Sequence, residues 1–190
     1  MKFSESGMEF NFGPGWAVRK YDDVPYFKRM GGEGLKGVDF IAIRHHRELI
    51  FIEVKNYQTR YNPSMDRAFE VSAKPADELA YELKRKFEDT LLAMDAVLQY
   101  FHRGWWYRRL RRLWLQWPWL QNDRAFWSRA HALADHHLHY VAWLALDLDD
   151  PENYEEALLD HLKGMQLEMA DRISIANGRH SPFGGEVKVG

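Results

Sequence analysis

The 190-residue chain has no cysteine, which excludes disulfide bonds and metal sites built on thiolates. It also has no uninterrupted apolar run of the roughly 18 or more residues that a transmembrane helix needs. The opening residues, MKFSESGMEF, do not contain the apolar core of a signal peptide. These absences predict a protein without a transmembrane segment, located in the cytoplasm.

A strong excess of charge of either sign is also missing, because the formal net charge is only −2. A generally basic nucleic-acid-binding surface is therefore excluded, and any phosphate recognition must come from a local patch. The 46% hydrophobic and 15% aromatic content is ample for a globular core. We expect a single domain over residues 1–190, with a loose glycine-rich tail at about 177–190.

Residues 37–58, GVDFIAIRHHRELIFIEVKNYQ, have the pattern of a β-hairpin. Two runs rich in β-branched and aromatic residues, 38–43 and 49–55, flank a polar loop at 44–48. Apart from a few charged positions, both faces of this strand pair are apolar. The pattern therefore predicts a central strand pair that is covered on both sides.

The charged positions of the hairpin are expected to meet. If the hairpin closes symmetrically about His46, Asp39 lies opposite Glu53, and Lys55 follows on the same face. Two carboxylates on directly opposed residues repel each other unless a proton or a divalent cation lies between them. Mg²⁺ prefers oxygen ligands and is usually held by one or two carboxylates. The hairpin therefore predicts half of a metal site.

The order of these residues resembles the PD-(D/E)XK, or restriction-endonuclease-like, nuclease superfamily. Asp39 matches the Asp of the motif, and residues 53–55 match its (D/E)XK part, whereas the usual proline before the Asp is Val38 here. The chain is similar to a little-characterised bacterial group with the successive motifs KYDD, GxKxVDF, IEVK and KxxDTL. These appear here at residues 20–23, 34–40, 52–55 and 86–91.

The resemblance implies an αβα sandwich, in which helices flank a central mixed sheet, and a nuclease that hydrolyses phosphodiester bonds, with DNA as the expected substrate. Asp39 and Glu53, with the Val54 backbone carbonyl, would hold Mg²⁺ or Mn²⁺. The metal would lower the pKa of a bound water and neutralise phosphate charge. Lys55 would position that water or stabilise the transition state. Gln58 would orient the substrate or the water.

The superfamily often takes a further acidic ligand from an early helix, which this sequence is not expected to contain. Residues 16–21 and 25–30 instead have the pattern of strands around an Asp22–Asp23 turn. The remaining candidates for this ligand are Glu5, Glu9 and Glu33.

The second half of the chain predicts further helices and strands. A helix begins near Pro75, and its apolar residues recur every three or four positions to Phe101. On it, Lys86 is a candidate nucleic-acid contact that shares a face with Asp89, and an ordinary surface pair is the alternative. Further helices are expected at 123–134 and 152–170, and strands at 138–146 and 172–176.

An insertion at about 102–137 is rich in arginine and tryptophan. Over residues 105–117, a helix would place several tryptophans and leucines on one side and Arg108, Arg109, Arg111 and Arg112 on the other. We favour a nucleic-acid-binding arm, because guanidinium groups bind phosphates and indole rings stack on bases. A contact with a protein partner or a second copy, a membrane-surface helix, and a structural hairpin with solvated arginines are the alternatives.

The same residues leave a second function open. A nuclease-like fold could serve as a catalytically silent binding or accessory module in a defence or mobile-element system. Metal binding without cleavage of any nucleic acid would favour this interpretation.

Overall fold

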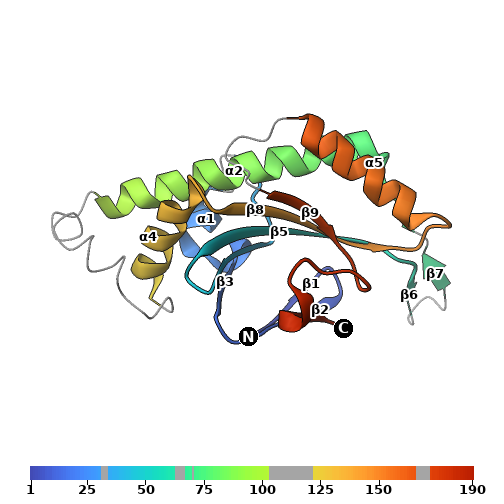
Figure 1. The fold of residues 1–190 in the computed structure, drawn as a ribbon, viewed down its shortest axis with the longest axis horizontal. Helices are drawn as coiled ribbons and strands as arrows, with labels where there is room; N and C mark the ends of the chain where they lie inside the picture. Colours follow the sequence, from blue (N-terminus) through green and yellow to red (C-terminus); the bar gives the residue numbers. More distant parts are fainter. Residues whose placement is uncertain (31–33, 63–66, 70, 103–121, 166–171) are drawn as a thin grey trace.

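The computed structural model describes residues 1–30, 34–62, 67–69, 71–102, 122–165 and 172–190. Its centre is a five-stranded mixed sheet with the strand order β3-β4-β5-β8-β9 (Figure 1). The strands β3, β4 and β5 pair antiparallel, whereas β5, β8 and β9 pair parallel. The strands are β3 (Trp16–Lys20), β4 (Phe40–Arg44), β5 (Glu48–Tyr57), β8 (Leu138–Leu146) and β9 (Arg172–Ala176).

The predicted hairpin is confirmed together with its register. Phe40 lies opposite Ile52 and Ile43 lies opposite Leu49, which is the pairing expected for closure about His46. His45 and His46 both have positive φ angles, of 49° and 60°, which turn the chain between the strands. The hairpin is buried on both faces, as its sequence predicts.

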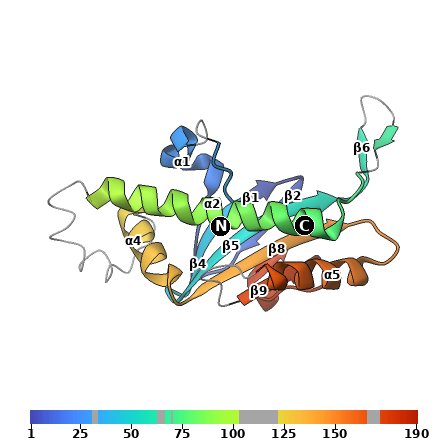
Figure 2. The same cartoon turned by 90° about the horizontal axis from the view of Figure 1, so that it is seen from above.

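The helices lie on one face of the sheet (Figures 1 and 2). The apolar stripe of α2 packs there as predicted, with Leu79, Leu83 and Phe87 fully buried against hairpin residues such as Phe51. The helices are α1 (Pro25–Met30), α2 (Ala76–His102), α4 (Asp123–Ala134) and α5 (Pro151–Gly164), and a 3₁₀ turn, η1 (Tyr21–Asp23), precedes α1. Among these described helices, none combines the length and apolar character that crossing a bilayer requires.

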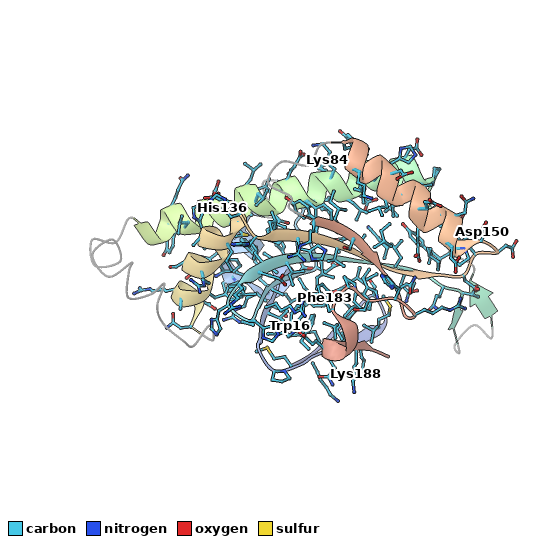
Figure 3. All side chains as sticks on the ribbon, in the orientation of Figure 1. Trp16, Lys84, His136, Asp150, Phe183 and Lys188 are labelled. Atoms are coloured by element: carbon cyan, nitrogen blue, oxygen red, sulfur yellow. The ribbon has the colours of Figure 1, made fainter. Side chains whose placement is uncertain are left out.

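The other face of the central sheet is covered by a second sheet rather than by helices. This antiparallel sheet has the order β1-β2-β10 and consists of β1 (Lys2–Glu5), β2 (Met8–Phe12) and β10 (Val187–Val189). Its buried side chains join Phe40 of β4 in a core that is rich in aromatic side chains. Trp16 and Phe183, which belong to this core, lie on the side of the sheet opposite α2 (Figure 3). The protein is therefore mixed α/β, but its layers differ from the expected αβα order.

The structure also contradicts two local predictions. The C-terminal tail is packed rather than loose, because Val187 and Phe183 are buried and β10 pairs with β2. Residues 25–30 form α1 rather than a strand, since Pro25 suits the first turn of a helix. A short hairpin of β6 (Arg60–Asn62) and β7 (Arg67–Phe69) follows β5, and a 3₁₀ turn, η3 (Gly184–Glu186), precedes β10.

Candidate metal centre

The hairpin brings Asp39 and Glu53 together on the face that α2 covers. Asp39 directly precedes β4, and its Oδ2 accepts a hydrogen bond from the Val54 backbone N–H at 2.7 Å. Glu53 lies in β5 with only 1% of its surface exposed. Burial, followed by the charge of Asp39, raises the pKa of Glu53 to about 7. Burial also raises the pKa of Asp39 above its ordinary value.

The two oxygens of Glu53 have different surroundings. Oε1 lies 2.5 Å from the Lys86 ammonium nitrogen and 3.4 Å from that of Lys55. Oε2 is buried and has no hydrogen-bond partner among the residues that the structure describes. Because nearly all buried polar atoms in folded proteins are hydrogen-bonded, this unpartnered carboxylate oxygen is a candidate ligand for a cation.

Lys55 is held by an acidic residue that sequence reasoning did not identify. Its Nζ lies 2.5 Å from Glu82 Oε1, and Lys74 Nζ lies 2.8 Å from Glu82 Oε2. Burial would raise the pKa of Glu82, but the hydrogen bonds from the two lysines outweigh it and lower the pKa to about 2. Glu82 precedes Lys86 by four residues on α2, and this spacing could have indicated a shared helix face.

The KxxDTL element of α2 fastens the chain segment that leads to Asp39. Asp89 Oδ2 accepts a hydrogen bond from the Lys36 backbone N–H at 3.0 Å, and Thr90 Oγ1 accepts one from Val38 N–H at 3.0 Å. Thr90 is fully buried and donates to the Lys86 carbonyl at 2.7 Å. The element therefore combines one side chain that contacts Glu53 with two that position the start of β4.

The glycine of the GVD motif is required by a close approach. A Cβ atom added to Gly37 would lie 2.1 Å from the Tyr21 ring, which itself stacks on Phe27 with 4.2 Å between ring centroids. The Tyr21 backbone N–H donates to the Asp39 carbonyl at 3.0 Å. A side chain at Gly37 would therefore displace Tyr21, whose backbone is hydrogen-bonded to Asp39.

A cleft of about 350 Å³ opens beside Asp39. Lys86 and Asp39 lie in its wall, so the cleft adjoins one carboxylate of the pair and the lysine that contacts the other. Tyr21 also lines the cleft, and its buried hydroxyl has no hydrogen-bond partner within the described part of the chain. The remaining lining residues are Asp22, Phe27, Lys28, Leu35, Lys36, Gly37 and Val38.

Some predicted site residues lie elsewhere. Side chains alternate along β5, so Asn56 points away from α2 and donates to the Ser6 carbonyl at 2.9 Å. Gln58 follows with the same parity, is exposed, and lines a separate pocket of about 650 Å³ with Met8 and Trp143. The structure thus does not bring Gln58 to the carboxylates.

The arginines proposed to bind nucleic acid, Arg108, Arg109, Arg111 and Arg112, lie outside the described residues. The described end of the insertion is helix α4, as predicted, and its Trp127 is buried against Phe27 at 5.2 Å between ring centroids. This tryptophan therefore belongs to the protein core and cannot stack on a base.

The candidates for a third acidic ligand separate in a similar way. The negative charge of Glu5 contributes to the raised pKa of Asp39, but Glu5 Oε2 forms an ion pair with Lys20 at 2.8 Å. Glu9 is exposed on β2, and Glu33 lies outside the described residues. Within the described ranges, no three acidic, histidine or cysteine side chains form a metal-binding group. Asp39 and Glu53 still fit Mg²⁺ or Mn²⁺, which can be held by two carboxylates and water.

Comparisons of the chain with protein-family models, with curated proteins and with solved structures found no match. The functional interpretation therefore depends on the chemistry of the site itself.

Proposed function

We propose that this protein is a metal-dependent nuclease that hydrolyses phosphodiester bonds, with DNA as its substrate. The observation that supports this most is the buried Oε2 of Glu53, which lacks a partner in the described structure although Asp39 is adjacent. A buried carboxylate pair is unfavourable on its own, and a divalent cation bound between the two groups would relieve the repulsion.

Asp39 and Glu53, with the Val54 carbonyl, would hold Mg²⁺ or Mn²⁺. The ion would supply a bound water of lowered pKa and positive charge for the phosphate. Asp39 is fixed for this role by the hydrogen bond from Val54, and Glu53 by its place in the central strand β5.

Lys55 would act as a cation rather than as a base. Burial alone would lower its pKa, but the hydrogen bond to Glu82 and the charge of Glu53 outweigh burial and raise it. A lysine that stays protonated can stabilise negative charge on a phosphate and orient a water molecule, but it cannot remove a proton. Glu82 would therefore act as a positioning residue for Lys55.

The proposal is tested by a substrate panel. Plasmid DNA, single-stranded DNA and RNA are incubated with wild-type protein and with Asp39→Asn, Glu53→Gln and Glu186→Gln, in Mg²⁺, Mn²⁺ or chelator. Glu186 is the matched control because it is a carboxylate on the opposite face of the central sheet. We expect metal-dependent cleavage by the wild type and Glu186→Gln only. Equal cleavage by all four proteins would refute the assignment.

A second candidate is the catalytically silent accessory module. It is favoured by the neutralisation of Glu53 by Lys86 and Lys55, since the protein can balance this charge without a metal. Metal binding at Asp39 and Glu53, combined with no cleavage anywhere in the panel, would support this candidate over the nuclease.

A further inference from the structure

Lys86 lies at the boundary between the carboxylates and the cleft. Its ammonium nitrogen is 2.5 Å from Glu53 Oε1, and the same side chain forms part of the cleft wall. The side chain is 19% exposed, so it is partly accessible from the cleft. It extends from α2, a helix that Asp89 and Thr90 tie to the segment before Asp39.

We infer that Lys86 is an internal counter-ion that a divalent cation displaces from Glu53, and that the cleft beside it binds a substrate phosphate. This inference rests on the proposed metal site. The metal site gains a defined exchange of partners, in which the metal binds the Glu53 carboxylate and Lys86 binds the phosphate.

Displacement follows from the geometry of one carboxylate. A cation that bound Oε2 of Glu53, which no described residue contacts by a hydrogen bond, would lie within a few ångströms of the ammonium group on Oε1. Two positive charges at such a short distance in a buried site repel each other strongly, because little water screens them. Since Lys86 is on a flexible side chain and the metal is held by two carboxylates, the lysine is the group that moves.

Lys55 provides an internal contrast. It also contacts Glu53, but at 3.4 Å, and its closest partner is Glu82 at 2.5 Å. Lys74 contacts the other oxygen of Glu82, so both oxygens of the carboxylate that holds Lys55 have a lysine partner. Metal entry should therefore move Lys86 and leave Lys55 where it is.

The cleft has the chemistry of a phosphate site. Lys28 and Lys36 lie in its wall together with Lys86. Tyr21 also lines the cleft, and its buried hydroxyl has no hydrogen-bond partner among the described residues. Asp39 and Asp22 are the carboxylates of the wall. Once a metal neutralises Asp39, the remaining charge is predominantly positive, which suits the phosphate next to the one being hydrolysed.

The first test follows the lysines of the wild-type protein and of Glu53→Gln by acylation and mass spectrometry. Ca²⁺ serves as the probe, because it takes oxygen ligands. We expect Ca²⁺ to raise the labelling rate of Lys86 several-fold, and a 5′-phosphorylated thymidine dinucleotide to lower it again. Labelling of Lys55 should not change. In Glu53→Gln, Lys86 should react quickly with or without Ca²⁺.

The second test measures Mn²⁺ affinity by calorimetry for the wild type, Lys86→Met and Lys86→Arg. Removing the competing charge should tighten Mn²⁺ binding about fivefold or more, a typical size for coupling between ligands of one site. Lys86→Arg keeps the charge and should bind like the wild type. Mn²⁺ binding with unchanged Lys86 labelling and equal affinities would overturn this inference alone. No binding of Mn²⁺ or Ca²⁺ to any of the proteins would overturn the metal site as well.

Discussion

Two carboxylates on opposite faces of the central sheet, Glu53 and Glu186, have opposite surroundings. Glu186 is 35% exposed, and both of its oxygens are bound: Arg44 donates to each, at 2.7 and 2.9 Å, and the Trp16 indole N–H donates at 2.9 Å. These hydrogen bonds lower the pKa of Glu186 to about 2. Glu53 is 1% exposed, its pKa is raised to about 7, and one of its oxygens lacks a partner among the described residues.

The difference fits a structural role for Glu186 and the proposed metal-binding role for Glu53. Glu186 is stabilised as an anion by the fold and fastens the C-terminal tail to β3 and β4. Glu53 is held in a place where its charge is unfavourable, which is a cost that binding or catalysis commonly explains. Contact with a basic residue does not separate the two cases, because both carboxylates have one. The two carboxylates differ instead in how many of their oxygens have hydrogen-bond partners among the described residues and in the direction of the pKa shift.

The largest expected effect comes from removing the basic partner. Lys86→Met should lower the free energy of unfolding by about 3–5 kcal/mol at pH 8, because it leaves a buried carboxylate incompletely paired. The double variant Lys86→Met/Glu53→Gln should recover most of this loss. Urea denaturation measures both.

The matched change on the other face is Arg44→Met. It should cost less than Lys86→Met, since water can hydrate the partly exposed Glu186. An equal loss of unfolding free energy in the two single variants, or no recovery in the double variant, would contradict the stated difference between Glu53 and Glu186.

The pH dependence of stability should have opposite signs for the two groups. The raised pKa of Glu53 means that the folded protein binds more protons than the unfolded chain between about pH 4.5 and 7, so stability falls as pH rises through this window. The lowered pKa of Glu186 means that stability rises with pH between about 2 and 4.5. Urea titrations at each pH give the two slopes.

Each slope should disappear in its own variant. Glu53→Gln should remove a fall on the order of 2–3 kcal/mol, and Glu186→Gln should remove the rise at low pH. A stability that increases from pH 5 to 7 because of Glu53 would show that its pKa is lowered rather than raised.

A smaller effect is expected at Gly37. Gly37→Ala should destabilise the protein by about 1–3 kcal/mol, because the new methyl group overlaps the Tyr21 ring. The shift should also weaken metal binding, since Tyr21 contacts the backbone of Asp39. Gly164→Ala is the control, as its Cβ would meet no described atom within 4 Å. Equal stability and metal affinity in both variants would contradict this role of the glycine.

Much of the fold follows from local patterns. Alternation and apolar runs predicted the hairpin register and the bounds of β8 and β9, because each strand carries in its own sequence the apolar side chains that it buries. The three- and four-residue spacing of α2 predicted its buried stripe for the same reason. The proximity of Asp39 and Glu53 was predictable, because the hairpin alone brings the two residues together.

The covering sheet depends on contacts that a local pattern does not encode. β2 and β10 are separated by about 175 residues, and their pairing helps to hold the tail against the sheet. The alternation of buried Met8, Phe10 and Phe12 with exposed Glu9 and Asn11 was the available signal for β2. The roles of Glu82 and Lys86 required the packing of α2 on β5, which sequence spacing does not determine.

The central claim, that Asp39 and Glu53 form a site for a divalent cation, is tested most directly by calorimetric titration of Mn²⁺ at pH 8. The wild type, Glu53→Gln and Glu186→Gln are compared under the same conditions. We predict one binding event in the wild type, an unchanged event in Glu186→Gln, and none in Glu53→Gln. Equal binding by Glu53→Gln, or no binding by the wild type, would contradict the account.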